Sequence, residues 1–521
     1  MNKSPTVFIP AAGLGSRIKG TNSTLPKPLL SIGNQPLIGR IMSLYPNGTQ
    51  FVVGVGYKAD WVKQVALIIA LENSQKVTFF ETNSWKTQNE GLTHTILDSK
   101  PHILGDFIFH AVDSIIPARI CLELMKSQEN TIVTGTPMTP GDFRFPRDGK
   151  WVRDRLDPQS SEQAYVGVSF IRNTDEFWNN LENEERQQPE AGETLGVDPR
   201  FIKVLNLAPT EWMDSGSKEG LENSRINFQN PDIVLERSNE AIWNIGPNMY
   251  KFHEDEEFIK NRILRAENLH PYVPKVSFVS PNIYSYPRVE GETLSKAPAE
   301  SFQLFLEFCQ QFWFENLADT RYEINNFEKF YKEKSINRIQ AYLTLDSGYS
   351  PKTINGKQVS KIDDLIECMP WDELSSISPA RAHGDLHPDN VVFNPIGKQF
   401  MLLDWRQEIA GNTGEIGDLY YELGKIMHGL MVDHEVVAQN GFRISTIGSD
   451  YTHSIEISVK KSNWLIQFYD FLEANSLDIR RTNLMTGLIF LNIASLHHYP
   501  YNKYLFTLGH ELVDNVLKFP K

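Results

Sequence analysis

The sequence feature that most constrains the fold of this chain is a segment in which two short apolar strands carry polar residues at their ends. Residues 381–393 read Arg-Ala-His-Gly-Asp-Leu-His-Pro-Asp-Asn-Val-Val-Phe, and residues 401–405 read Met-Leu-Leu-Asp-Trp. Asp385 follows a His-Gly pair typical of a tight loop. Asn390 comes just before the strand Val391 to Phe393, and a second strand, Phe400 to Leu403, ends at Asp404. The pattern predicts two carboxylates and an amide held at fixed points by two strands.

This set of side chains suits phosphoryl transfer. The reaction needs a carboxylate beside the attacking hydroxyl, and an amide oxygen with a second carboxylate to hold magnesium on ATP. The protein-kinase catalytic loop has the same five-residue step from Asp to Asn, with arginine where Gly384 stands here. The pattern His-Gly-Asp-x-His-x-x-Asn, followed by a strand and Asp-Trp, resembles the aminoglycoside phosphotransferase and choline kinase family. The resemblance implies that Asp385 is catalytic, that Asn390 is catalytic and binds metal, and that Asp404 binds Mg²⁺.

A second pattern lies at the start of the chain. The strand Thr6 to Ile9 runs into Pro10-Ala-Ala-Gly-Leu-Gly-Ser-Arg17, and a strand before a Gly-rich loop is one way in which a backbone binds phosphates. Residues 25–30, Leu-Pro-Lys-Pro-Leu-Leu, and residues 32–38, Ile-Gly-Asn-Gln-Pro-Leu-Ile, follow. The combination resembles sugar-phosphate and choline-phosphate nucleotidyltransferases. The resemblance implies that Ala12, Gly13 and Gly15 bind a nucleotide, and that Arg17 and Lys27 are catalytic cations that neutralise its phosphates.

Three later segments follow in the order that this family requires. Residues 87–92, Thr-Gln-Asn-Glu-Gly-Leu, open a predicted helix, and the resemblance makes Gln88 and Gly91 nucleotide-binding candidates. The apolar strand that begins at Phe107 ends in Asp113, and ligands of open α/β sheets bind at such strand ends. Residues 211–217, Glu-Trp-Met-Asp-Ser-Gly-Ser, look like the Trp-x-Asp-x-Gly-Thr segment of sugar-1-phosphate nucleotidyltransferases. Asp113 and Asp214 are therefore the expected magnesium carboxylates.

One departure from the family leaves the acceptor open. Relatives that activate hexose phosphates often carry Glu-Lys-Pro before the strand that corresponds to Tyr165 to Ile171, whereas residues 151–158 here contain no lysine. Arg153 or Arg155 could hold the acceptor phosphate instead, since a guanidinium binds phosphate with two parallel hydrogen bonds. Gly167 could let an acceptor approach the backbone.

The region after residue 225 resembles the small lobe of a kinase. We expect strands at 233–235, 241–245 and 248–252, followed by a charged helix from Glu256 to Leu269. Lys251 and Glu267 would be the strand lysine that binds ATP and the helix glutamate that orients it. The rival interpretation is a surface lysine and an ordinary helix carboxylate. Tyr284 to Leu294 matches the hinge between lobes.

The remaining residues are expected to form the large lobe. Apolar residues between Phe302 and Trp313 recur at helical spacing and predict a core helix. A second helix is predicted over Glu415 to His428, with Asp418 as a cap or loop anchor. The following tail residues either line the acceptor pocket or pack in the core: Trp464, Phe468, Tyr469, Phe490, His497, His498 and Tyr499.

Composition limits the classes of partner. The formal net charge is −14, which argues against nucleic acid as a main partner. Cys121, Cys309 and Cys368 lack metal-ligand spacing and are expected to be buried in a reducing compartment. The first residues show no signal pattern and no apolar run reaches membrane-spanning length, so we expect a cytoplasmic protein without membrane insertion. A homo-oligomer is left open.

Together these patterns predict an α/β chain: an N-terminal Rossmann-like nucleotidyltransferase domain with a mixed, mostly parallel sheet, followed by a bilobal protein-kinase-like (α+β) domain. The expected domains are 1–225, a small lobe at 226–290 and a large lobe at 291–521. The implied function is bifunctional, with Mg²⁺ in both steps: ATP phosphorylates a small alcohol or sugar, and a second NTP, CTP being one option, donates a nucleotidyl group to that phosphate. Two alternatives remain: a choline- or ethanolamine-type kinase joined to a CTP:phospho-alcohol cytidylyltransferase, and a chain in which one half is a degenerate nucleotide-binding module.

Overall fold

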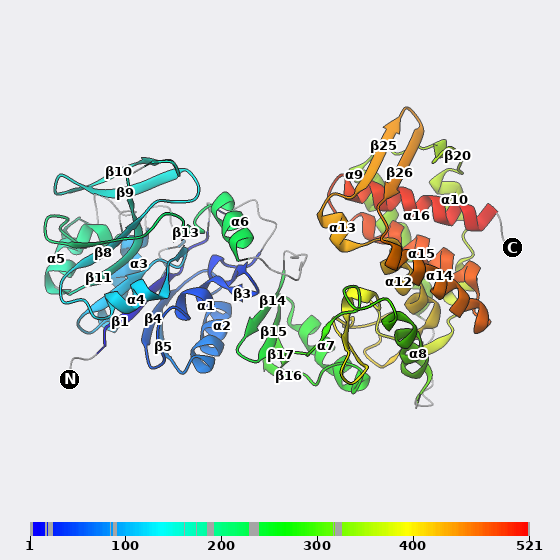
Figure 1. Cartoon of the computed structure of the whole chain (residues 1–521), viewed down its shortest axis with the longest axis horizontal. Coiled ribbons are helices and arrows are strands. Elements are labelled where there is room, and N and C mark those ends of the chain that lie inside the picture. Colours follow the sequence, from blue (N-terminus) through cyan, green and yellow to red (C-terminus); the bar gives the residue numbers. More distant parts are fainter. Residues whose placement is uncertain are drawn as a thin grey trace. The chain divides into compact units, whose positions relative to one another are not determined.

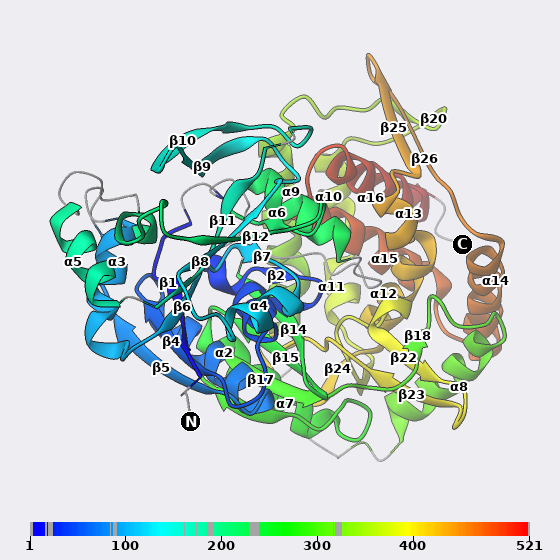
Figure 2. The ribbon, with the colours of Figure 1, turned by 60° about the vertical axis from the view of Figure 1, so that its left-hand side comes forward.

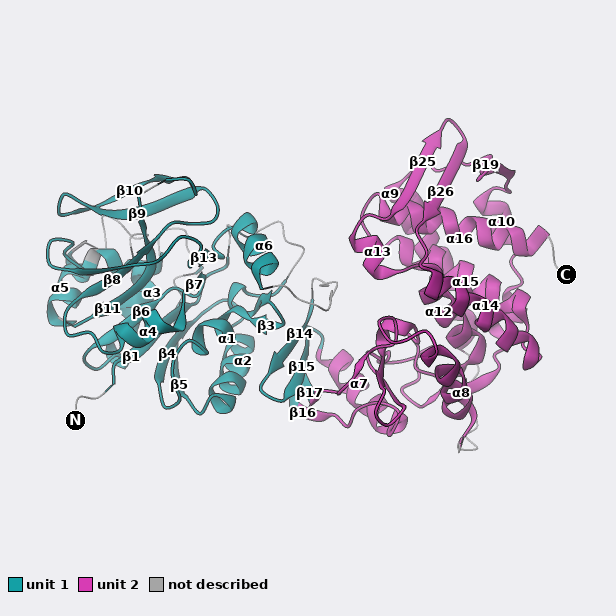
Figure 3. Cartoon of the chain, in the orientation of Figure 1, with its two compact units in different colours: residues 1–255, 279–285 teal, residues 256–278, 286–521 magenta. Residues whose placement is uncertain are grey.

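The computed structural model of the chain describes residues 4–15, 18, 24–83, 85–86, 91–160, 162–172, 174–184, 192–228, 239–315, 317 and 326–518 (Figure 1). These residues form two compact units. The first comprises residues 1–255 and 279–285, and the second comprises residues 256–278 and 286–521 (Figure 3). Arg17, Gln88 and the strand expected at 233–235 lie outside the described residues.

The first unit is built on one large sheet. Its described strands are β1 (Thr6–Ala11), β4 (Gln50–Val55), β5 (Lys76–Glu81), β6 (Phe107–His110), β8 (Thr131–Gly135), β9 (Gly141–Arg147), β10 (Lys150–Leu156), β11 (Ala164–Ile171) and β12 (Lys203–Asn206). The main order is β10-β9-β11-β6-β1-β4-β5, and β8 pairs with both β11 and β12. The predicted strands at 6–9 and 165–171 are confirmed as β1 and β11. The strand expected from Phe107 to Asp113 is β6, which ends at His110, so Asp113 lies in the turn between β6 and β7.

Helices cover both faces of this sheet, which explains why its central strands are almost continuously apolar. Val7 and Ile9 face one core with α1 (Leu37–Met42), α2 (Ala59–Glu72) and α4 (Ala118–Leu124). Phe8 faces a second core with α3 (Leu92–Ser99) and α5 (Thr174–Glu184). Successive residues of β1 thus enter opposite cores, as the two-residue period of a strand requires.

The sheet is mixed, as predicted, but it is not mostly parallel. The described pairings are four parallel, β1–β4, β1–β6, β4–β5 and β8–β12, and four antiparallel, β9–β10, β6–β11, β8–β11 and β9–β11. The order runs outward from β1 through β4 to β5 and then returns to β6 on the other side of β1. The carboxyl ends of β1 and β6 therefore meet at a switch point, where open α/β sheets bind ligands.

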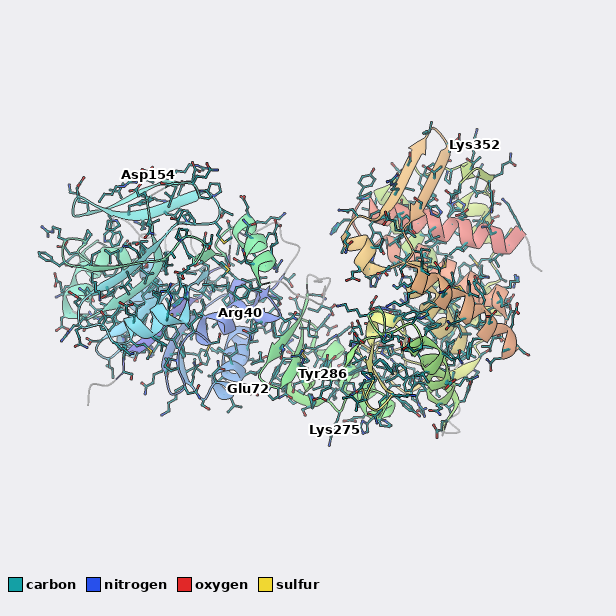
Figure 4. All side chains as sticks on the ribbon, in the orientation of Figure 1. Arg40, Glu72, Asp154, Lys275, Tyr286 and Lys352 are labelled. Atoms are coloured by element: carbon teal, nitrogen blue, oxygen red, sulfur yellow. The ribbon has the colours of Figure 1, made fainter. Side chains whose placement is uncertain are left out.

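Short elements complete the ligand edge of this unit. They are the 3₁₀ turns η2 (Lys27–Leu29), η3 (Lys100–His102) and η4 (Gly192–Gly196), the strand pairs β2 (Ser31–Ile32) with β3 (Gln35–Pro36) and β7 (Ser114–Ile115) with β13 (Met213–Asp214), and the helix α6 (Lys218–Asn227). Arg40, which Figure 4 labels on α1, donates from Nε to Ile32 O at 2.9 Å and from Nη2 to Gly33 O at 2.6 Å. This arginine fixes the turn between β2 and β3.

The compact units do not follow the boundaries expected at 225 and 290. The strands β14 (Glu240–Ile245), β15 (Asn248–His253), β17 (Ile283–Pro287) and β16 (Ser277–Ser280) form a four-stranded sheet in that order. Trp243 and Phe252 of this sheet lie in the first unit's core. Glu254, which follows β15, forms an ion pair with Lys58 at 2.5 Å. Packing alone does not show where a functional module ends, so the three-domain division stays a prediction.

The second unit is mainly helical. Its helices are α7 (Glu256–Leu269), α8 (Ser301–Phe314), the π-helix η6 (Lys329–Glu333), α9 (Lys334–Leu345), α10 (Ile362–Cys368), α11 (Trp371–Ser375), the 3₁₀ turn η7 (Pro388–Asn390), α12 (Leu419–Met431), α13 (His434–Ala438), α14 (Val459–Ala474), α15 (Ile479–Ala494) and α16 (Tyr501–Lys518). Its strands are β18 (Glu292–Thr293), β19 (Thr353–Ile354), β20 (Lys357–Gln358), β21 (Pro379–Arg381), β22 (Val391–Asn394), β23 (Gln399–Leu402), β24 (Ile416–Asp418), β25 (Phe442–Ile447) and β26 (Asp450–Ile455). The β25–β26 hairpin extends away from the helices (Figures 1 and 2).

Local predictions for this unit are largely confirmed. The helix expected at 256–269 is α7, and the stripe between Phe302 and Trp313 is buried on α8. The helix expected from Glu415 begins instead at Leu419, because residues 416–418 form a strand with β21. Asp418 caps that helix as predicted. Cys121 and Cys309 are buried, but Cys368 is exposed at the end of α10, contrary to expectation.

Across the described ranges, no helix combines the length and apolar character needed to cross a membrane.

Candidate functional site

The loop after β1 packs against Lys27 at Gly15. Gly15 has a φ of +64°, a backbone conformation that favours glycine, and a Cβ on it would lie 3.3 Å from Lys27 Cβ. A Cβ on Gly13 would meet no atom within 4 Å. The Ala12 carbonyl accepts a hydrogen bond from Tyr57 N at 3.1 Å. The loop is thus tied at Ala12 to the segment after β4, and there is space beside Gly13 for a ligand.

Asp113, Asp214 and Lys27 converge at the switch point. Lys27 Nζ forms an ion pair with Asp113 Oδ2. A Cβ on Gly216 would lie 2.9 Å from Asp214 Oδ1 and 3.1 Å from Asp113 Oδ2, so both carboxylates crowd against one point. Two carboxylate oxygens directed at one small volume suit a hard divalent cation such as Mg²⁺. The donor set therefore fits the predicted metal.

Hydrogen bonds fix the chain around these carboxylates. Asp113 O accepts from Ser215 N at 2.8 Å, and Asp214 Oδ1 accepts from Gly216 N at 3.0 Å. The buried His110 contacts Tyr45 Oη at 2.7 Å through Nδ1 and Ser114 O at 2.8 Å through Nε2. Burial lowers the pKa of His110 to about 4, so the ring is neutral near pH 7. His110 therefore acts as a structural bridge behind Asp113.

The acceptor candidates of the first unit are not brought to this point by any described contact. Arg153 and Arg155 are exposed on β10, and Arg155 Nε lies 3.9 Å from Asp157 Oδ1. Between them, Asp154 pairs with Arg147 at 2.9 Å (Figure 4). The roles of both arginines stay predictions.

Two glycine candidates have local structural explanations. Gly167 has a φ of +79° and accepts a hydrogen bond from Ala111 N at 2.9 Å. A Cβ there would lie 2.9 Å from Ala111 Cβ. Gly91 is the N-cap of α3. Packing accounts for Gly167, and its acceptor role stays a prediction.

Sequence reasoning missed Glu193 in η4. This glutamate is only 5% exposed, and burial raises its pKa to about 7, with Tyr165, Arg144 and Asp113 among the groups that act on it. A carboxyl that titrates near neutrality is notable near a site. The residues that flank Glu193 in the sequence indicate a loop and do not predict a functional carboxylate.

In the second unit, the β22–β23 hairpin sets the position of Asn390 relative to Asp404. Val391 pairs with Leu402, and Leu403 N donates to Asn390 O at 2.8 Å. Asn390 Nδ2 donates to Asp385 O at 2.9 Å, which leaves its carbonyl oxygen as the atom that can bind a cation. Asp404, with a φ of +60°, accepts from Arg262 Nη1 at 2.9 Å. The hairpin thus brings the predicted metal ligands to one end.

Asp385 is held in its ionised form. Its Oδ1 lies 2.7 Å from Lys425 Nζ, and the two side chains are 23% and 6% exposed. Burial favours the neutral acid, but the charge of Lys425 foremost, together with Arg406, outweighs burial and holds the pKa of Asp385 well below its ordinary value. Gly384, with a φ of +87°, makes the tight turn before it.

Three polar residues that the sequence analysis missed shape this loop. The buried Glu422 accepts from His383 N at 2.9 Å and from Gly384 N at 2.7 Å. The fully buried Arg265 donates to the carbonyl oxygens of Ala382, His383, Arg406 and Gly414. The sequence did carry a signal for Glu422 and Lys425. Together with His428 they place a polar residue at every third position of a helix whose other residues are mostly apolar.

His387 connects the loop to a histidine-rich group. Its Nε2 lies 3.9 Å from Asp385 Oδ2 and its Nδ1 lies 3.8 Å from Asp389 Oδ2, which also contacts His434 Nδ1 at 2.9 Å. Burial lowers the pKa of His387 to about 4. The neutral ring therefore packs behind the loop near pH 7 and carries no charge toward Asp385.

A cavity of about 110 Å³ opens beside Lys425. Its lining residues are Lys334, Arg338, Arg406, Tyr421, Lys425, Ile489, Asn492, Ile493 and Leu496. None of the seven tail residues proposed for an acceptor pocket is among them. Trp464, Phe468 and Phe490 are instead fully buried.

The predicted pair of Lys251 and Glu267 falls in two different units. Glu267 lies on the exposed face of α7, opposite the buried Arg262 and Arg265. The nucleotide-binding role of both residues stays a prediction.

Comparisons with known proteins find similarity over part of the chain. No family model matches the sequence. The bifunctional protein GlmU of Methanococcus aeolicus is 26% identical over 132 residues, which are 25% of this chain and 30% of that protein. The aligned region therefore spans about a third of the relative's length.

Two solved structures each align with somewhat less than half of the chain. One is the CTP:phosphocholine cytidylyltransferase from Streptococcus pneumoniae, with a TM-score of 0.34 and 13% identity over 44% of this chain and 100% of that one. The other is the inositol-1-phosphate CTP transferase from T. maritima, with a TM-score of 0.34 and 12% identity over 43% of this chain and 96% of that one. The sheet of the first unit is mixed and has helices on both of its faces.

Proposed function

We propose that the protein is a bifunctional enzyme with two magnesium-dependent steps. In the first, ATP phosphorylates a hydroxyl of a small alcohol or sugar. In the second, a nucleotidyl group passes from another NTP to the new phosphate, and pyrophosphate leaves. The product would be a nucleoside-diphosphate-activated precursor of the kind used for surface polysaccharide or lipid.

The nucleotidyl-transfer half rests on the convergence of Lys27, Asp113 and Asp214 at the switch point. An acceptor phosphate oxygen bonds to the α-phosphorus, and the bond from that phosphorus to the bridging oxygen breaks as pyrophosphate departs. Magnesium bound by Asp113 and Asp214 would supply positive charge to the phosphates. Lys27 lies on a loop stiffened by Pro26 and Pro28, so its ammonium is aimed before the reaction begins.

The kinase half rests on the ion pair between Asp385 and Lys425 beside Asn390. The acceptor oxygen bonds to the γ-phosphorus of ATP, the β–γ bridging bond breaks, and ADP leaves with the electron pair. Because Asp385 stays ionised, it can accept the hydrogen bond of the acceptor hydroxyl, orient it and take its proton as the new bond forms. Positioning and charge supply most of the catalysis in such reactions. Asn390 and Asp404 would hold magnesium on the ATP phosphates.

The same observations argue against a degenerate half. Each unit retains the carboxylates that its reaction needs and a cation in contact with one of them: Lys27 on Asp113 and Lys425 on Asp385. A module that had lost catalysis would have no need of ion pairs with this arrangement in both units.

Separate readouts for the two reactions test the proposal. The purified protein is incubated with Mg²⁺, ATP, each NTP and a panel of sugars and alcohols, while ADP and pyrophosphate are measured independently. Asp385→Asn and Asp404→Ala should abolish ADP release but leave pyrophosphate release from a phosphorylated acceptor. Asp113→Asn should do the reverse. If a variant lowered both products equally or neither, the assignment of the two reactions to the two sites would be wrong.

A further inference from the structure

The cavity beside Lys425 has an unusual charge. Its walls come from α9, the loop after β23, α12 and α15, all within the second unit. Four lining residues have basic side chains, Lys334, Arg338, Arg406 and Lys425, and no lining residue carries a carboxylate. A small cavity with this lining attracts an anion and repels a cation.

Within the part of the chain that the structure describes, one carboxylate, Asp385, pairs with a basic residue of this lining. Lys425 pairs with Asp385 at 2.7 Å. Among the described residues, no ion pair joins a carboxylate to Lys334, Arg338 or Arg406. Lys334 Nζ lies instead over the Phe330 ring at 4.3 Å, and the Arg406 guanidinium lies 5.6 Å from the Tyr421 ring centroid. Four basic side chains therefore share a small volume, and Asp385 is the one carboxylate that pairs with any of them among the described residues.

The crowding affects Lys334 directly. Burial, and after it the charges of Arg406, Lys425 and Arg338, lower the pKa of Lys334 to about 6. The ammonium is thus unfavourable while the cavity holds protein charges alone. An anion among these cations would reverse the imbalance, because each cation gains an opposite charge within a desolvated site.

Geometry connects the cavity to the catalytic loop. Lys425 lines the cavity and also contacts Asp385 Oδ1, and Arg406 packs over Gly384, whose added Cβ would lie 2.9 Å from Arg406 Cβ. A molecule in the cavity therefore lies next to Asp385. Its carbon skeleton would contact the apolar wall formed by Ile489, Ile493 and Leu496.

We infer that this cavity binds the acceptor of the kinase half, and that this acceptor already carries an anionic group, a phosphate or a carboxylate, besides the hydroxyl that reacts. The inference rests on the proposed function and names its substrate class: a phosphorylated sugar or polyol, or a hydroxy acid. The anion contacts Lys334, Arg338 and Arg406, and the hydroxyl reaches Asp385. The same lining excludes amino alcohols such as choline, whose positive charge would enter a cationic cavity.

Matched acceptors test the substrate class. ADP release is measured with glucose, glucose 6-phosphate and gluconate, with glycerol, glycerol 3-phosphate and glycerate, and with choline and ethanolamine. The anionic members of a set should have a KM at least tenfold below that of the neutral member, and the amino alcohols should be the poorest acceptors. The phosphate and carboxylate members separate the two sources of negative charge.

Variants of the lining test the site. Lys334→Met and Arg338→Met should raise the KM for the anionic acceptor about 10- to 100-fold, the usual worth of a hydrogen bond between charged groups, with the KM for ATP within twofold of wild type. Lys357→Met, an exposed lysine on β20, should change neither value. A second readout needs no ATP. Glycerol 3-phosphate or orthophosphate should raise the melting temperature of the wild type but not that of Arg338→Met.

The outcomes separate this inference from the proposed function. ADP release that favours neutral or cationic acceptors, or an unchanged acceptor KM in both variants, would overturn the anionic-acceptor assignment and leave the kinase reaction standing. No ADP release with any acceptor, together with normal pyrophosphate release, would instead refute the kinase proposal itself. A phosphate-induced rise in melting temperature that is present in the wild type and in Lys357→Met but lost in Arg338→Met would support the site.

Discussion

Lys425 Nζ lies 2.7 Å from Asp385 Oδ1, although the two residues are forty positions apart in the sequence. The contact exists because α12 crosses behind the loop at 383–385. One turn earlier on the same helix, Glu422 accepts hydrogen bonds from His383 N and Gly384 N. A single helix therefore sets both the shape of the loop and the ionisation of its carboxylate.

Lys425→Met should lower kcat for ADP release about a hundredfold or more. Without the ammonium, burial is weakly opposed, so the pKa of Asp385 should rise from well below its ordinary value. The activity needs the ionised form, so the acid limb of the pH–rate profile should move to higher pH, and raising the pH should restore part of the loss. Lys357→Met is the matched control. A variant with the wild-type profile would show that Lys425 does not control Asp385.

Gly13→Ala separates a structural glycine from a nucleotide-binding one. A Cβ at Gly13 meets nothing within 4 Å, so the variant should fold with an unchanged melting temperature. If a nucleotide lies against this backbone, the added methyl should raise the KM for the NTP at least tenfold. Gly348→Ala, whose Cβ would meet its nearest atom at 3.9 Å, is the control for the substitution itself. Unchanged NTP binding would remove Gly13 from the site.

Gly216→Ala tests the convergence of the two carboxylates. The new Cβ would lie 2.9 Å from Asp214 Oδ1 and 3.1 Å from Asp113 Oδ2, so both must move. We expect pyrophosphate release to fall at least tenfold and its Mg²⁺ requirement to increase, because two metal ligands are displaced together. ADP release by the same sample serves as the internal control. Full pyrophosphate release would show that these carboxylates do not act as a pair.

Local sequence patterns predicted local structure well. The helix expected at 256–269 is α7, since its apolar positions recur at helical spacing, and Asp418 is the expected cap. The start of α12 was misjudged because strand pairing of residues 416–418 with β21 overrides the helical pattern there. The relative positions of Asn390 and Asp404 follow from the two strands that carry them.

Contacts between distant segments could not be predicted in this way. Arg265 lies on α7, yet its hydrogen bonds reach carbonyl groups more than a hundred residues later. Lys334 and Arg338 sit one turn apart on α9 and look like an ordinary solvated face until α12 and α15 close the cavity around them. The charge of this cavity is thus a tertiary property. For the aromatic tail residues the sequence left a pocket role and a core role open, and Trp464, Phe468 and Phe490 are buried.

The depressed pKa of Lys334, about 6, should make stability depend on pH. An unfolded lysine has a pKa near 10.4, so between about pH 6 and pH 10 the unfolded chain binds one more proton than the folded chain. Stability from this group therefore rises with pH across that window and is lost on acidification toward pH 6. The groups that act on Lys334 are Arg338, Arg406, Lys425 and, with opposite sign, Asp385.

Lys334→Met removes this titration. The melting temperature of the wild type relative to the variant should fall as the pH is lowered from 9 to 6, measured without phosphate. Lys357→Met should follow the wild type at every pH. Parallel curves for the wild type and Lys334→Met would mean that Lys334 keeps an ordinary pKa and that the cavity is less crowded with charge than its geometry indicates.

Lys27→Ala should block pyrophosphate release and leave ADP release intact. As the acceptor phosphate attacks, negative charge grows on the α-phosphate and on the departing pyrophosphate, and the ammonium next to Asp113 lies where it can offset that charge. Loss of one preorganised donor typically lowers the rate about 100- to 1000-fold. Lys58→Ala serves as the control, because Lys58 pairs with Glu254 at 2.5 Å and has no proposed part in the reaction. A folded Lys27→Ala protein that released pyrophosphate at nearly the wild-type rate would mean that the first unit does not catalyse transfer through this lysine.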